Sequence, residues 1–176
     1  MASIVLSFVG NQDPLAATDT EGSICTLLRF LLTEKQKTIK KVILLYTEGT
    51  QTKAKDTQDY IESEPDLRSL ALELRATSAK LSRDPTDLRG AAEEAREGLK
   101  LVQEDMAPGD HIEFNASSGT PAMKSSFSLL QAAGYVTHGT VWQVRNPREM
   151  RPGQDHVFET DVSVLRWEFD LSLIHI

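Results

Sequence analysis

The chain has very little cysteine and no long apolar run. Cys25 is the single cysteine among 176 residues, which excludes an internal disulfide framework and a cysteine-based zinc site and favours a reducing compartment. No apolar segment is as long as a membrane span, and the first residues contain neither a basic region nor a cleavage site. We therefore expect a cytoplasmic protein that has no membrane partner.

Positive charge is also in short supply. The chain has 19 lysines and arginines against 26 aspartates and glutamates, which gives a formal net charge of −7. Proteins that coat long DNA or RNA depend on an excess of cations that displaces counterions. We therefore expect no direct binding of long nucleic acid, whereas a small phosphorylated ligand in a locally positive pocket remains compatible with this charge.

Several common catalytic and cofactor motifs are missing. The loop after the first apolar run has neither GxGxxG nor a Walker lysine–serine pattern, so dinucleotide-binding and P-loop functions are not supported. The four histidines lack metal-ligand spacing. Asp13, Asp19 and Glu21 carry the carboxylates that Mg²⁺ prefers, but we favour helix capping and solvation for them. The sequence thus predicts no metal site and no cofactor.

Short apolar runs alternate with amphipathic segments along the chain. We predict strands at residues 3–9, 42–46, 70–74, 111–115, 135–144 and 157–169, and helices at 23–33, 52–61, 84–106 and 122–133. This alternation indicates a single α/β domain over residues 1–170, with a Rossmann-like, mainly parallel sheet of about six strands flanked by helices. The last two strands are joined by a turn-rich segment and predict an antiparallel hairpin.

Three polar loops follow predicted strands. They are residues 10–22, 47–50 and 115–120. In parallel sheets, ligands bind beyond the carboxyl ends of the strands, near the point where the strand order reverses. We therefore expect these loops to converge on one binding site.

The loop at 115–124 has the composition of an anion site. Small residues at 117–119 connect a strand to a helix, for which Thr120 is a good N-cap and Pro121 fits the first helical position. Unpaired N–H groups and the helix dipole at such a junction suit phosphate. Lys124 lies one turn further on and could reach the same anion. An ordinary capped turn is the alternative interpretation.

Arg145, Arg148 and Arg151 form a small basic cluster around the loop of the predicted hairpin. We interpret them as solvated loop residues. A contact with phosphate is the alternative.

Two stretches carry a resemblance to a known family. The first is Phe8-Val9-Gly10-Asn11-Gln12-Asp13-Pro14, and the second is Asn115-Ala-Ser-Ser-Gly-Thr-Pro-Ala-Met-Lys124, which a later Ala-Gly-Tyr follows. Together they resemble a CRISPR-associated Rossmann-fold (CARF) domain of type III CRISPR antiviral defence over nearly the whole chain. The resemblance implies a homodimer that binds cyclic oligoadenylate, a ring of four or six AMP units, across its two-fold axis.

The resemblance also implies a set of site residues. Residues 117–120 would donate hydrogen bonds to phosphates, Lys124 would supply charge, and Thr47 and Glu48 would line the adenine or ribose side. The full implied set is Gly10, Asn11, Gln12, Asp13, Thr47, Glu48, Asn115, Ser117, Ser118, Gly119, Thr120, Met123 and Lys124.

Three functions are open within the family. The first is a sensor that regulates a fused or missing effector, and the second is a stand-alone ring nuclease. The third is a fragment of a transcriptional regulator. Ring nucleases need no metal, because a ribose 2′-OH attacks the adjacent phosphate in line and leaves a 2′,3′-cyclic phosphate. Candidate catalytic groups are Lys124 and a hydroxyl of Ser117, Ser118 or Thr120. A nucleotide-binding α/β protein outside CRISPR is the alternative to the family itself.

The last residues, Leu171-Ser-Leu-Ile-His-Ile176, prompt a separate hypothesis. One back-translation, CTG TCT CTT ATA CAC ATC, resembles a transposon-end sequencing adapter. Residues 171–176 would then be a non-native tail, and an effector encoded after Asp170 would be missing. An ordinary apolar strand end is the alternative.

Overall fold

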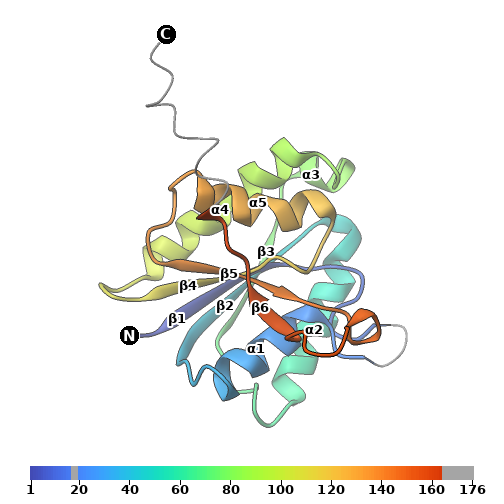
Figure 1. Ribbon diagram of the computed structural model, residues 1–176. Coiled ribbons are helices and arrows are strands. Elements are labelled where there is room, and N and C mark those ends of the chain that lie inside the picture. Colours follow the sequence, from blue (N-terminus) through green and yellow to red (C-terminus); the bar gives the residue numbers. More distant parts are fainter. Residues whose placement is uncertain (17–19, 164–176) are drawn as a thin grey trace.

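The computed structural model of the chain describes residues 1–16 and 20–163 (Figure 1). The strands are β1 (Ser3–Phe8), β2 (Ile39–Tyr46), β3 (Leu72–Ala76), β4 (His111–Asn115), β5 (Gly139–Val144) and β6 (Val157–Glu159). The α-helices are α1 (Ser23–Thr33), α2 (Gln51–Ser63), α3 (Ala79–Arg83), α4 (Leu88–Asp105) and α5 (Pro121–Ala132), and 3₁₀ turns cover Glu48–Thr50 and Pro147–Glu149. Asp19, the predicted strand residues after 163 and the proposed tail at 171–176 lie outside the described residues.

The six strands form one sheet in the order β3-β2-β1-β4-β5-β6. The first five are parallel to their neighbours, and β6 runs antiparallel to β5. This confirms the predicted Rossmann-like α/β fold with an antiparallel pair at its end. Since β1 lies between β2 and β4, the strand order reverses there, and this reversal positions the loops after β1 and β4 for ligand binding.

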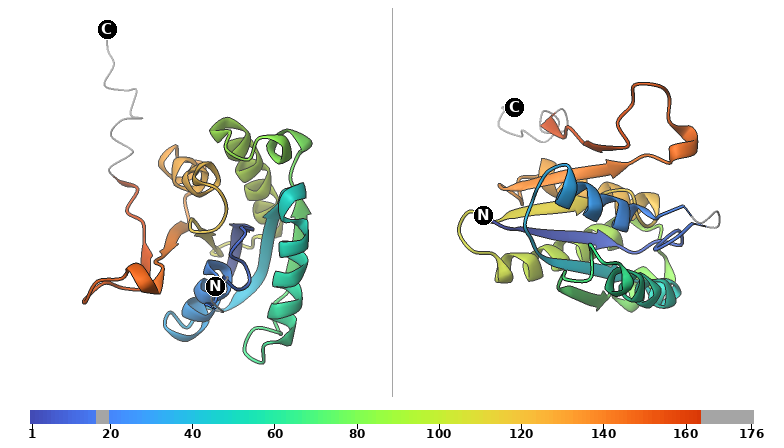
Figure 2. Two further views of the ribbon diagram at one scale, coloured as in Figure 1. Left: turned by 90° about the vertical axis from the view of Figure 1, so that its right-hand side faces the viewer. Right: turned by 90° about the horizontal axis from the view of Figure 1, so that it is seen from below.

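Helices cover both faces of the sheet, with α1 and α2 on one side and α3, α4 and α5 on the other (Figures 1 and 2). Successive residues of a strand point to opposite faces. In β1, Leu6 and Phe8 therefore enter the core beneath α4 and α5, whereas Val5 enters the core beneath α1. All six residues of β1 are buried, as a central parallel strand requires.

Most predicted elements match the structure, but several bounds were wrong. The strand β2 begins at Ile39 instead of residue 42, so it includes Lys40 and Lys41. Lys41 fits there because its ammonium pairs with Glu73 and Asp105 from other elements. The strand β5 begins at Gly139 instead of residue 135. The short helix α3 was not predicted.

A buried carboxylate anchors the middle of the sheet. Glu113 of β4 is fully buried. Its Oε1 accepts a hydrogen bond from Ser3 Oγ at 2.8 Å and pairs with the ammonium of Lys37, and its Oε2 accepts from Trp142 Nε1 at 2.6 Å. These partners offset the cost of removing the charge from water.

Replacing this carboxylate should destabilise the fold. We expect Glu113→Ala to lower the free energy of unfolding by about 3 kcal/mol, because it leaves the Trp142 N–H and the Lys37 ammonium without their partner. The matched control is Glu97→Ala, since Glu97 is 62% exposed and pairs with Lys100 on the helix surface. That change should cost less than about 0.5 kcal/mol. Urea unfolding of both variants is the measurement, and equal losses would contradict the assignment.

Candidate ligand-binding site

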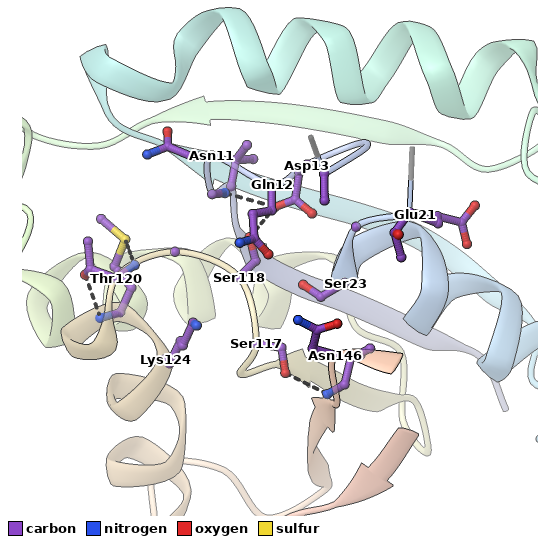
Figure 3. A pocket seen from close by; sticks show the side chains of 18 of the residues that line it. Asn11, Gln12, Asp13, Glu21, Ser23, Ser117, Ser118, Thr120, Lys124 and Asn146 are labelled. Atoms are coloured by element: carbon purple, nitrogen blue, oxygen red, sulfur yellow. Dashed lines mark hydrogen bonds between the residues drawn. The ribbon is translucent and has the colours of Figure 1, made fainter. Parts of the chain in front are cut away.

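A cavity of about 810 Å³ lies beyond the carboxyl ends of β1, β2, β4 and β5 (Figure 3). Its wall consists of residues 9–13, 20–23, 117–120 and 144–149, with Thr47, Thr50 and Lys124 among the others. The three predicted loops therefore converge, as expected from the parallel sheet. The loop of the β5–β6 hairpin adds a further wall.

Asp13 connects the first loop to its surroundings. Its Oδ2 accepts hydrogen bonds from the backbone N–H of Gly10 at 2.9 Å and from the hydroxyl of Ser118. Its Oδ1 accepts from the N–H of Ile24 at 3.5 Å, in the first turn of α1. The N-cap of that helix is Gly22, which has no side chain, so Asp13 takes over the capping. The predicted ligand residue Asp13 thus also holds two loops and a helix together.

Burial raises the pKa of the Asp13 carboxyl above its ordinary value, because desolvation disfavours the charged form. Hydrogen bonds from Ser118, Gly10 and Ile24, and the charge of Lys53, act in the opposite direction. Burial is the largest of these effects.

Two glycines allow the loop after β1 and the loop after β4 to touch. A Cβ atom on Gly10 would lie 2.7 Å from the backbone nitrogen of Gly119. Gly119 has φ +91°, a left-handed conformation that favours glycine, and its own Cβ would lie 2.8 Å from Met123 Sδ. The cavity floor therefore depends on close backbone contact between the loops after β1 and β4.

Asn115 lies beneath the cavity and does not line it. It is fully buried, and its Nδ2 donates to Ser7 Oγ at 3.1 Å and Ser23 Oγ at 3.2 Å. Its Oδ1 accepts from the N–H of Ser117 at 3.0 Å. Asn115 thus shapes the turn above it. Glu48 is exposed and also lies outside the cavity wall.

The three hydroxyl residues of the loop after β4 differ in the hydrogen bonds that they can still donate to a ligand. Thr120 Oγ1 donates to the carbonyl of Pro85 at 2.6 Å and accepts from the N–H of Met123 at 3.4 Å, which confirms the predicted N-cap of α5. The hydroxyl of Ser118 donates to Asp13. In contrast, Ser117 Oγ accepts from the N–H of Val144 at 2.6 Å, which leaves its proton available to a ligand.

The same loop presents donors and a cation. The backbone N–H groups of Ser118 and Gly119 have no acceptor within the described part of the chain. Lys124 is half-buried, lines the cavity and makes no ion pair with any described residue. In the view of Figure 3, the side chain of Lys124 lies between Thr120 and Ser117. Unpaired N–H groups at a helix N-terminus beside an ammonium suit an anion such as phosphate.

The hairpin loop is the part of the site that sequence reasoning missed. The strand β5 is parallel to β4, so the residues after Val144 emerge at the same edge of the sheet. Arg145 follows directly and Arg148 lies three residues further on; both line the cavity, whereas Arg151 does not. The charges were visible in the sequence, but their place beside the cavity needed the strand order.

The other carboxylate candidate for a metal, Glu21, is already engaged. Its Oε1 accepts from Arg29 Nε at 2.9 Å and from the hydroxyl of Tyr60 at 3.2 Å. Residues 1–16 and 20–163 contain no group of three histidine, cysteine or acidic residues placed to hold a metal ion. Within the same ranges, no helix is long and apolar enough to cross a membrane.

Comparison with known proteins identifies the fold. No family model and no curated protein matches the chain. Among solved structures, 96% of the chain aligns with 43% of Csm6 from Enterococcus italicus, bound to cyclic hexa-2′-fluoro-hexa-dAMP, with a TM-score of 0.72 and 17% identity. Csm6 is a CARF-domain protein of type III CRISPR. The chain has the fold of a CARF domain.

A second structure supports this fold more weakly. Protein VC1899 from Vibrio cholerae aligns over 89% of the chain and 35% of its own length, with a TM-score of 0.56 and 15% identity. The chain therefore spans less than half the length of either protein. On the CARF fold, the loops after β1 and β4 are those that the sequence resemblance implied as the site, and both line the cavity.

The first prediction for this site concerns the cap of α5. We expect Thr120→Ala to lower the free energy of unfolding by about 1 kcal/mol, because the N–H of Met123 loses its acceptor. The control is Ser125→Ala, an exposed position on the same helix, which should cost nothing, because alanine favours helix. Urea unfolding without ligand is the measurement. A ligand-binding loss that exceeds the stability loss would instead make Thr120 a ligand contact.

A second prediction concerns pH. Because the pKa of Asp13 is raised in the fold, the folded state binds more protons than the unfolded state in the pH window between about 3.9 and the raised pKa. The stability that Asp13 contributes is therefore fully present below about pH 3.9 and shrinks as the pH rises through the raised pKa. We expect the difference in unfolding free energy between native protein and Asp13→Ala to decrease over this window. A difference that grows with pH would contradict the assignment.

Proposed function

We propose that the chain is a sensor domain that binds cyclic oligoadenylate as a homodimer and controls an effector in type III CRISPR defence. The observation that carries this proposal is the cavity between the loops after β1 and β4. Its wall contains a turn with two free N–H groups and a lysine, none of which has a partner among the described residues. Support comes from the fold, which aligns with 43% of a Csm6 structure bound to cyclic hexa-2′-fluoro-hexa-dAMP.

The phosphate contacts would come from hydrogen-bond donors in the loop after β4 and at the start of α5. A phosphate placed over the turn would accept from the N–H groups of Ser118 and Gly119 and from the hydroxyl of Ser117. The ammonium of Lys124 would add a charge-assisted bond. None of these donors is engaged within the described residues, so the binding costs no internal hydrogen bond.

The base contacts would come from an amide in the wall formed by the loop after β1. Gln12 is exposed and lines the cavity, and its carboxamide can pair with both the acceptor and the donor on the edge of adenine. The buried residue Thr47 lines the side beside β2. In a two-fold dimer, each protomer would hold an equal part of a symmetric ring.

Ring cleavage would use the same cavity with fewer groups than the sequence suggested. The hydroxyl protons of Ser118 and Thr120 are donated to Asp13 and Pro85, so they hold the loops in place. Ser117 and Lys124 are the remaining candidates. This arrangement favours holding a ring over cutting it, and supports the sensor as the primary function.

Binding and the fate of the ring can be measured together. The protein is titrated with cyclic tetra-adenylate and, separately, cyclic hexa-adenylate in a calorimeter, and the recovered nucleotide is run on a column. We expect one ring to bind and to be recovered intact. Linear products with cyclic-phosphate ends would replace the sensor with a ring nuclease. If neither ring bound, the proposed function would be rejected.

The contribution of the lysine can be tested separately. We expect Lys124→Ala to weaken binding of the ring by about 1.5–3 kcal/mol, the range of a hydrogen bond to a charged group. The matched control is Lys55→Ala, which removes the same charge from an exposed position of α2, on the other face of the sheet and away from the cavity. Equal affinities of the two variants would remove Lys124 from the site.

A further inference from the structure

The loop of the β5–β6 hairpin is attached to the turn at residues 117–120, which we call the ligand turn. The N–H of Val144, at the end of β5, donates to Ser117 Oγ at 2.6 Å, and the next residue donates its N–H to the carbonyl of His156 at 2.8 Å. Figure 3 shows Lys124 and Asn146 on either side of Ser117. The loop therefore stands as a wall of the cavity, with the turn between it and α5.

The guanidinium of Arg145 is held in place without a carboxylate. Its central carbon lies 3.7 Å from the centre of the Phe158 ring, and its Nη1 donates to the carbonyl of Asp155. Stacking and one neutral acceptor fix the plane of the group but leave its charge uncompensated within the described residues. A fixed guanidinium can form two parallel hydrogen bonds to phosphate at little cost in side-chain entropy.

The second arginine of the loop is also available. Arg148 is exposed and lines the cavity. Its N–H donates to Asn146 Oδ1 at 3.1 Å, which fixes the backbone, and its side chain has no partner among residues 1–16 and 20–163. The nearby carboxylate of Glu149 accepts from Asn146 Nδ2 at 3.4 Å instead of pairing with an arginine.

We propose that Arg145 and Arg148 form a second phosphate-binding wall, separated by Ser117 from the wall that carries Lys124. Two cationic walls in one cavity fit an anion with at least two phosphate groups, such as a ring of nucleotides, better than a mononucleotide. This inference rests on the proposed function, since it adds a second contact to the same ligand. The sequence resemblance implied only the loops after the first and fourth strands.

The test compares two arginines of the same loop. Arg148→Ala and Arg151→Ala each remove one exposed charge, but only Arg148 lines the cavity. Dissociation constants for the ring that binds are measured by calorimetry at several salt concentrations. We expect Arg148→Ala to weaken binding about tenfold. It should also lower the slope of log Kd against the logarithm of the salt concentration by roughly one. Arg151→Ala should change neither quantity.

A second probe separates this inference from the proposed function. Inorganic tripolyphosphate carries several phosphate groups but no adenine, and its binding is measured for the same three proteins. If neither ring binds but tripolyphosphate binds and depends on Arg148, the second wall stands and the proposed function fails. If Arg148→Ala and Arg151→Ala have equal affinities for every ligand that the native protein binds, the second wall is overturned. If the native protein binds none of these ligands, both proposals fail.

Discussion

The cavity depends on one buried carboxylate. Asp13 is 2% exposed, and it accepts hydrogen bonds from its own loop, from Ser118 of the ligand turn and from the first turn of α1. A carboxylate in this position is costly unless donors surround it, and here each of them belongs to a different segment. The carboxylate of Asp13 therefore has its hydrogen-bond donors only when these three segments are in their correct positions.

The polar groups around the cavity divide into two sets. One set holds the walls: Asn115 organises the turn from below, Thr120 joins α5 to the loop before α4, and Ser118 is fixed to the first loop. The other set faces the cavity and has hydrogen-bonding capacity that no described residue uses; it includes Lys124 and the hydroxyl proton of Ser117. A binding site that is held by separate residues from those that face the ligand is already organised before the ligand arrives.

Local patterns predicted the elements well, and long-range contacts explain the failures. The bounds of α1 and β4 followed from apolar spacing and turn residues, and the cap at Thr120 followed from its place before Pro121. The early start of β2 depends on Lys41 reaching carboxylates distant in sequence. The role of Asn115 could not be predicted either, because its partners lie on β1 and α1.

The contact between Gly10 and Gly119 has a mechanical consequence. There is no room for even a methyl group between the two loops, so neither loop can shift toward the other. The ligand turn leads directly into α5. Asp13 links the loop after β1 to the first turn of α1 by its hydrogen bond with the N–H of Ile24. Because these helices lie on opposite faces of the sheet (Figure 1), a displacement of the cavity floor would have to move both helix layers of the domain together.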